Sequence, residues 1–165
     1  WVGIAHCGVF NDGEGNWYYT SQGRLPEGAR GNPYSNAIMH GHVRRILWTE
    51  TGWPVVLPER YAAVPQASLT AEEFVGEWEH ITLTYSYQKQ RLSSKLTLNA
   101  DGTMSGAMSG KWSFDPETNT LRLGTYKLCV ARELDWEASP RKVTIVYAGY
   151  SSNGRQTFWG KKVEE

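Results

Sequence analysis

The sequence has no excess of charge of either sign and no long apolar run. Its 17 lysine and arginine residues balance 17 aspartate and glutamate residues, so no net field favours the phosphates of nucleic acids or an anionic membrane surface. No apolar run approaches the roughly 20 residues that a helix needs to span a bilayer. We therefore expect a globular protein that has neither nucleic acid nor a membrane as its partner.

Cysteine is also scarce. Cys7 and Cys129 lie far apart, and neither belongs to a CxxC or Cys/His motif. This spacing argues against structural zinc and against a disulfide scaffold. We expect both to be buried free thiols. No signal peptide is visible, so the residues alone do not indicate the compartment.

Tryptophan and tyrosine are abundant where phenylalanine is not. The chain has eight Trp and nine Tyr but only four Phe. Trp and Tyr join a flat apolar face to a polar edge, which suits partly solvated sites such as sugar-binding clefts. The alternative is that these aromatic residues fill β-rich cores, and we expect this for most of them.

The pattern along the chain is that of antiparallel hairpins, because turns rich in Gly, Asn and Asp separate short runs of Val, Ile, Thr, Tyr and Trp. We expect strands at residues 4–10, 17–22, 43–48, 55–57, 76–87, 94–98, 103–108, 110–115, 120–123, 126–131, 142–150 and 155–163. Only residues 70–75 predict a helix, since Thr70 followed by Glu73 forms a capping box. The fold class is therefore all-β.

A division into two domains is expected near Pro65, because residues 62–67 lack strand alternation. The second domain, residues 68–165, has about eight strands, enough to close into a small barrel. The first, residues 1–64, has about four, the number in one propeller blade, and a blade buries its faces only by stacking on others. It opens in mid-strand with the apolar run from Val2 to Phe10, and we expect other chain segments to cover it.

Several segments resemble a known family. The runs GIAHCGVF at 3–10, GNWYY at 15–19, HVRRILW at 42–48 and GWPVVLPERY at 52–61 resemble the last blade of the arabinan-degrading enzymes of glycoside hydrolase family 43. The remainder, which opens with Gly76-Glu77-Trp78, resembles the lipocalin-like β-barrel that follows the propeller in some endo-acting arabinanases. The resemblance implies the final blade of a five-bladed propeller followed by a small antiparallel barrel.

The resemblance also implies a function. Such enzymes cleave α-1,5-linked L-arabinan by an inverting mechanism, with the catalytic carboxylates and a calcium ion in the propeller channel. His6 is implied as a contact of that ion, whereas without the resemblance it would be taken for a core histidine. Gln22 and Arg24 are candidates for substrate binding, and an extracellular or periplasmic location is implied. The partners are then an N-terminal propeller portion and arabinan.

This chain is expected to hold no catalytic carboxylate. Asp12 and Glu14 lie in a turn, Glu50 lies in another, and Glu59 lies at the end of the blade, so none is on an inner strand where its pKa could be raised. The acids would then lie upstream, and the chain alone would be inactive. The rival interpretation is a non-catalytic carbohydrate-binding or structural module.

Other residues are expected to have structural roles. The turn at 11–16 lacks the ligand pattern of a calcium loop and favours a glycine-rich hairpin. His40 and His42 could share a metal, but exposure at a strand start is the commoner outcome. In the barrel, Trp78, Trp112 and Tyr126 are expected in the core, and Trp136 and Trp159 at the surface.

Overall fold

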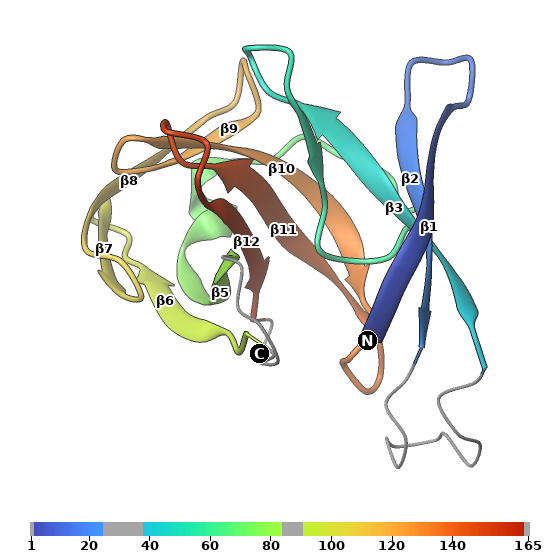
Figure 1. Ribbon diagram of the computed structural model, residues 1–165. Coiled ribbons are helices and arrows are strands. Elements are labelled where there is room, and N and C mark those ends of the chain that lie inside the picture. Colours follow the sequence, from blue (N-terminus) through green and yellow to red (C-terminus); the bar gives the residue numbers. More distant parts are fainter. Residues whose placement is uncertain (1, 25–37, 84–90, 164–165) are drawn as a thin grey trace. The chain divides into compact units, whose positions relative to one another are not determined.

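The structure is a computed structural model that describes residues 2–24, 38–83 and 91–163. It is all-β, as predicted (Figure 1). The chain divides into two compact units, residues 1–46 and 47–165. Within the described residues the one helix is a short 3-10 turn, and none has the length and apolar character needed to cross a membrane.

Four strands form the first sheet, and they follow one another in chain order (Figure 1). They are β1 (Val2–Asn11), β2 (Trp17–Arg24), β3 (His40–Trp48) and β4 (Pro54–Val56). β1 pairs with β2 and β2 with β3, both antiparallel. The predicted strands are confirmed, each within a few residues of its expected ends.

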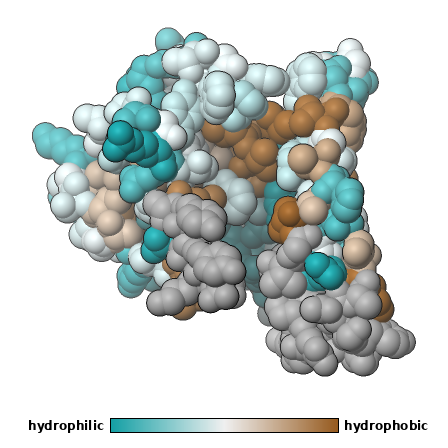
Figure 2. Space-filling model, viewed as in Figure 1, coloured by the Kyte–Doolittle hydropathy of each residue, from teal (hydrophilic) through white to brown (hydrophobic). Residues whose placement is uncertain are grey.

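β1 is an edge strand, and its apolar side chains are exposed. Ile4, Val9 and Phe10 keep 46%, 59% and 45% of their surface accessible, and Figure 2 shows hydrophobic surface over this sheet. Cys7, on the same strand, is exposed as well. The prediction of a buried thiol is therefore wrong for Cys7, because among the described strands none lies beyond β1 to cover it.

β3 carries two histidines with different surroundings. His40 is exposed, whereas His42 is buried. The expectation that both would be exposed is wrong for His42, which packs beside Gly23 on β2. A Cβ atom on Gly23 would lie 3.0 Å from the His42 ring, so the absence of a side chain there makes room for the imidazole.

Eight strands close into an antiparallel barrel, in the order β10-β11-β12-β5-β6-β7-β8-β9 (Figure 1). Their bounds are β5 Gly76–Leu83, β6 Ser94–Leu98, β7 Thr103–Gly106, β8 Gly110–Asp115, β9 Thr120–Leu123, β10 Tyr126–Asp135, β11 Lys142–Tyr150 and β12 Thr157–Lys162. The predicted barrel is confirmed. The end of the strand predicted at 76–87 lies outside the described residues.

The barrel interior is packed with side chains. Trp78 and Phe74 are fully buried, and Phe74 stacks on Phe114 with ring centroids 4.4 Å apart. Phe74 ends the 3-10 helix Ala71–Phe74, whose capping box at Thr70 is present as predicted. Trp112 is buried and Tyr126 is partly buried against the same core. These aromatic residues therefore hold the barrel together, as expected of them.

A second apolar cluster lies on the outside of the barrel, where Val55 and Leu57 pack on residues of β10 and β11. Trp159 borders it and donates its indole N–H to the carbonyl of Val56 at 2.9 Å. Trp136 donates to the carbonyl of Arg60 at 2.9 Å. Both tryptophans are more exposed than Trp78 and Trp112, as predicted, but each is only half-buried and not fully at the surface, since it also hydrogen-bonds the segment before residue 61.

Candidate functional sites

The residues that the sequence predicts for metal and substrate binding lie on β1 and β2. Ala5 pairs with Gln22, and the register then shifts before Gly8, so that His6 has a positive φ of 50° and an exposed side chain. Gln22 and Arg24 are half-buried. The structure thus brings the neighbour of His6 opposite Gln22. The roles of all three residues stay predictions.

Among the residues that the structure describes, His6 has no set of ligands around it that would form a calcium site. One imidazole offers a single nitrogen, whereas calcium takes six to eight oxygen ligands. Among the described residues, the group of acidic side chains close enough to share an ion lies elsewhere, at Glu59, Asp135 and Glu137. Any calcium ion near His6 would need most of its ligands from outside the described chain.

Asp12 is a structural residue of the first hairpin. Its carboxylate accepts hydrogen bonds from the backbone N–H of Glu14 at 2.8 Å and from the side chain of Asn16 at 2.7 Å. The Asn16 hydrogen bond, followed by that of Glu14, lowers the pKa of Asp12. The carboxylate is therefore ionised and used to close the turn, in line with the prediction of a hairpin turn.

Lys161 on β12 lies among four carboxylates. Its ammonium nitrogen is 2.7 Å from Glu137, 3.0 Å from Asp135, 3.2 Å from Glu59 and 3.9 Å from Glu79. Burial raises the pKa of Glu59, and the nearby lysine only partly offsets this. Burial opposes ionisation of Lys161, yet its hydrogen bonds to Glu137 and Asp135 raise its pKa. The ammonium group of Lys161 thus occupies the position that a metal ion would take among these carboxylates.

A histidine and a tyrosine form a polar pair inside the barrel. Nδ1 of His80 hydrogen-bonds the Tyr147 hydroxyl at 2.6 Å, and Nε2 lies 3.1 Å from the Thr82 hydroxyl. Burial lowers the pKa of His80 and raises that of Tyr147. Both groups are therefore neutral near pH 7. Gly160 makes room for the tyrosine, because a Cβ atom there would lie 2.1 Å from its ring.

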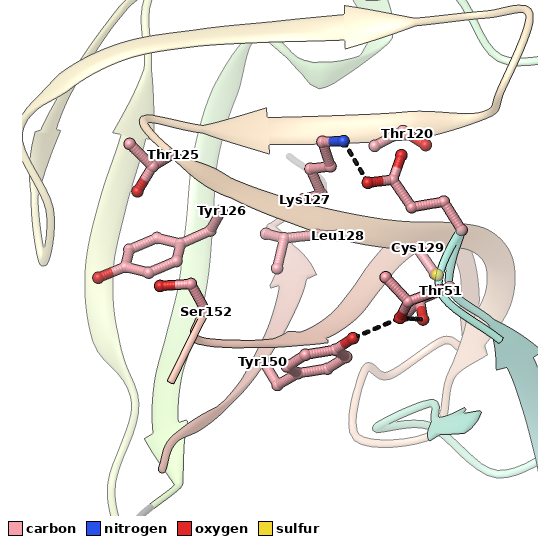
Figure 3. Close-up of a pocket in the computed structure, with 11 residues that line it drawn as sticks. Thr51, Thr120, Thr125, Tyr126, Lys127, Leu128, Cys129, Tyr150 and Ser152 are labelled. Carbon is pink, nitrogen blue, oxygen red and sulfur yellow. Dashed lines mark hydrogen bonds and ion pairs between the residues drawn. The ribbon is translucent and has the colours of Figure 1, made fainter. Parts of the chain in front are cut away.

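A cleft of about 290 Å³ opens on the surface of the second unit (Figure 3). The β3–β4 turn, at residues 49–51, forms one wall, and residues 125–129 of the β9–β10 hairpin form another. Tyr150, at the end of β11, completes it with Ser152. Figure 3 shows Thr125, Tyr126 and Ser152 at one end and Thr51, Cys129 and Tyr150 at the other.

Comparison with known proteins identifies the domain that carries this cleft. A sequence model described as the GH43 C-terminal lipocalin-like domain matches residues 58–160, most of the chain and nearly all of the barrel. The chain belongs to this family. The GH43 C-terminal domain is thus the part that holds the four carboxylates around Lys161, the His80–Tyr147 pair and most of the cleft.

A curated relative extends the likeness beyond the GH43 C-terminal domain. The extracellular endo-α-(1→5)-L-arabinanase of Thermotoga petrophila is 28% identical over 173 aligned residues, which take in the whole of this chain. The chain spans 35% of that protein's length. The residues of the four-stranded sheet that precede the GH43 C-terminal domain therefore have counterparts in the same relative.

Solved structures share the fold. The glycoside hydrolase family 43 protein YxiA of Bacillus licheniformis has a TM-score of 0.81 at 23% identity, over 98% of this chain and 36% of its own. The Thermotoga petrophila endo-1,5-α-L-arabinanase has a TM-score of 0.74 at 24% identity, over 98% and 35%. Both therefore support the all-β architecture in which the GH43 C-terminal domain follows a four-stranded sheet.

Sequence reasoning missed the cleft and the Lys161 cluster. Each joins residues that are far apart in the chain, such as Glu59 and Lys161. The only signal for the cleft was the general excess of Trp and Tyr, which does not say which of them line a surface. For the cluster, the clue was the two acidic residues Asp135 and Glu137 on either side of Trp136, where β10 ends.

Proposed function

We propose that this chain is the C-terminal part of a glycoside hydrolase that cleaves α-1,5-linked L-arabinan outside the cell. The observation that carries the proposal is the likeness to an extracellular arabinanase along the whole chain, and not only along the family domain. Because the chain spans about a third of that relative, the rest of the enzyme would come from an N-terminal portion.

The exposed apolar residues of β1 support such a partner. Ile4, Val9 and Phe10 present a hydrophobic strand to solvent, which a monomeric protein rarely does over a contiguous surface. A neighbouring propeller blade would cover them, since blades bury their faces against one another. The first sheet is therefore the proposed point of assembly with the N-terminal portion.

In the assembled enzyme the two catalytic carboxylates would come from the N-terminal portion. Inversion needs one as acid and one as base, spaced to admit a water molecule. A calcium ion in the channel would supply positive charge next to the reacting sugar. His6, exposed on β1, would offer one contact to the ion directly or through water, and Gln22 and Arg24 would contact substrate from β2.

The proposal is tested by joining this chain to its N-terminal portion and assaying linear α-1,5-arabinan. We expect reducing ends to appear with the assembled enzyme and not with the 165-residue chain alone. Proton NMR of the first product should show the inverted anomer. Turnover by the chain alone would contradict the assignment of the catalytic acids to the N-terminal portion. An assembled enzyme that is inactive on arabinan but active on another glycan would contradict arabinan as the substrate.

The same preparation tests the role of His6. His6→Ala should lower the calcium content measured by atomic emission and reduce activity about 10- to 100-fold, the range found for residues that surround a metal. Cys7→Ser, at the neighbouring exposed position, is the matched control and should leave both unchanged. Full calcium and full activity in His6→Ala would remove His6 from the site.

The second candidate function is a non-catalytic carbohydrate-binding module, and one observation favours it. The family domain has its own cleft lined by tyrosine and hydroxyl groups. Under this alternative the barrel binds glycan while the assembled protein cleaves none. The arabinan assay separates the two functions, because binding without any hydrolysis by the assembled protein fits only the module.

A further inference from the structure

The cleft of Figure 3 has the chemistry of a site for a neutral, hydroxyl-rich ligand. Seven of its eleven lining residues carry a hydroxyl group: Thr49, Thr51, Thr120, Thr125, Tyr126, Tyr150 and Ser152. Its two charged residues, Glu50 and Lys127, form an ion pair with each other. The described lining therefore offers many donors and acceptors and no net charge for an ionic ligand.

The Tyr150 ring is held in place at one end of the cleft. Its hydroxyl hydrogen-bonds the Thr51 hydroxyl at 2.8 Å, and Thr51 in turn bonds the Thr49 hydroxyl at 3.0 Å. Figure 3 shows the Tyr150–Thr51 contact. A ring fixed in this way can receive the C–H face of a sugar without losing further rotamer freedom, which lowers the cost of binding.

The Tyr126 ring is anchored at the other end. It packs against the core residue Phe158 with ring centroids 4.7 Å apart, while its own side chain stays partly accessible and lines the cleft. Thr125 and Ser152 are exposed beside it. A sugar unit has apolar C–H faces and hydroxyl groups around its edge. Two fixed aromatic rings can contact the C–H faces, while the hydroxyl groups of the cleft can bond those of the sugar.

The cleft continues into a second hollow of about 320 Å³. The two hollows share four lining residues: Thr49, Glu50, Thr120 and Cys129. The second adds Trp48, which is 47% exposed. A third aromatic side chain thus lies along the same path, which indicates a ligand longer than one sugar unit.

We propose that this path from Tyr126 past Tyr150 to Trp48 binds a neutral oligosaccharide. The site is built from residues of the second unit, whereas His6, Gln22 and Arg24 belong to the first. Its use of arabinan in particular rests on the function proposed above. The class of ligand rests on the lining alone: aromatic rings, hydroxyl groups and a self-neutralised ion pair.

The test is titration of the 165-residue chain with linear α-1,5-arabino-oligosaccharides, xylo-oligosaccharides, cello-oligosaccharides and anionic oligogalacturonates of equal length. Binding is followed by isothermal calorimetry and by backbone amide shifts in NMR. We expect saturable binding of at least one neutral series, with shifts centred on residues 48–51, 125–129 and 150–152. The anionic series should bind at least about tenfold more weakly, since Lys127, the one cation among the described lining residues, is paired with Glu50.

Two exposed serines provide the variant and its control. Ser152→Arg places a long side chain in the cleft and should weaken binding at least about tenfold. Ser105→Arg makes the same change on β7, away from the lining, and should leave binding unchanged. Equal binding by both variants, binding with shifts elsewhere, tighter binding of the anionic series, or no saturation by any neutral series would each overturn the proposal.

These outcomes separate this site from the proposed function. If xylo- or cello-oligosaccharides fill the cleft and arabino-oligosaccharides do not, the site stands and its use of arabinan is contradicted, while the arabinan assay of the assembled enzyme still decides the proposed function. If the assembled enzyme cleaves arabinan while no neutral oligosaccharide binds the cleft, the function stands and the site falls.

Discussion

His80 is an ionisable group that the barrel holds in its neutral form. Its imidazole is buried and hydrogen-bonded to Tyr147, and burial lowers its pKa from 6.5. The unfolded chain therefore binds a proton at a higher pH than the folded chain does. The free energy of unfolding should fall as pH decreases through 6.5 and level off below the folded-state pKa.

This pH dependence is a testable prediction at the scale of one residue. Urea unfolding of the wild type and of His80→Asn, which keeps a polar group near the Tyr147 hydroxyl, should be compared from pH 8 to pH 5. The wild type should lose more stability than the variant on acidification, with a slope difference of at most about 1.4 kcal/mol per pH unit, the limit for one proton. Parallel curves would show that His80 does not carry the effect.

The sequence predicts single residues well where local pattern decides their surroundings. Trp78 and Trp112 are in the core, as expected of large residues on alternating strands. The environment of Cys7 was mispredicted, because its burial depends on a neighbour beyond β1. That of His42 was mispredicted because the space beside Gly23 lies across the sheet. In both cases the deciding contact is with another strand.

At the scale of elements, the ion pairs of Lys161 connect three segments of the chain. Lys161 joins β12 to Glu59, which precedes the barrel, and to Asp135 and Glu137 near the end of β10. Its side chain is only 11% exposed. Removing one partner from a buried ion cluster leaves the opposite charges without compensation, which is strongly destabilising.

Lys161→Met should therefore lower the free energy of unfolding by about 3 kcal/mol. The matched control is Lys95→Met, which breaks the exposed pair with Glu77 and should cost less than about 1 kcal/mol. Urea titration monitored by tryptophan fluorescence measures both. If the two variants are equally stable, the cluster does not hold these segments together.

Most strands were predictable from the sequence, and the differences between the predicted and observed strand ends have local causes. The strand expected at 103–108 ends at Gly106, where φ is +94° and a Cβ atom would lie 2.3 Å from the Lys95 carbonyl oxygen. β10 continues past Ala131 to Asp135. The sequence did not predict this extension because it contains the charged residues Arg132 and Glu133. Only in the folded barrel is Glu133 buried and Arg132 paired with Glu73.

At the scale of the whole molecule, the exposed apolar edge of β1 should govern association. Sedimentation velocity of the chain alone should show concentration-dependent oligomers, since an uncovered hydrophobic edge strand templates pairing. Val9→Lys should shift the distribution towards monomer. Val143→Lys, at a similarly exposed valine of the barrel, should not. A wild-type chain that stays monomeric at all concentrations would contradict a blade that needs neighbours.

The cleft shows what a single sequence cannot supply. Thr51 and Tyr150 are hydrogen-bonded although they are 99 positions apart, and Lys127 pairs with Glu50 across 77 positions. Periodicity and turn chemistry report on neighbours in the chain, so they predicted the strands on both sides of the cleft but not their meeting. A surface composed of such distant partners becomes visible only once the barrel is closed.

The indole contacts of Trp136 and Trp159 bear on how this module can be cut and recombined. Both donors bond carbonyls of residues that precede the family domain or lie at its start, at Arg60 and Val56. A barrel excised at residue 68 would carry two indole groups stripped of their acceptors and an apolar patch where Val55 and Leu57 had been. A fragment meant to fold as this domain in another protein should therefore begin upstream of Val55, so that it includes the strand that packs on the outside of the barrel.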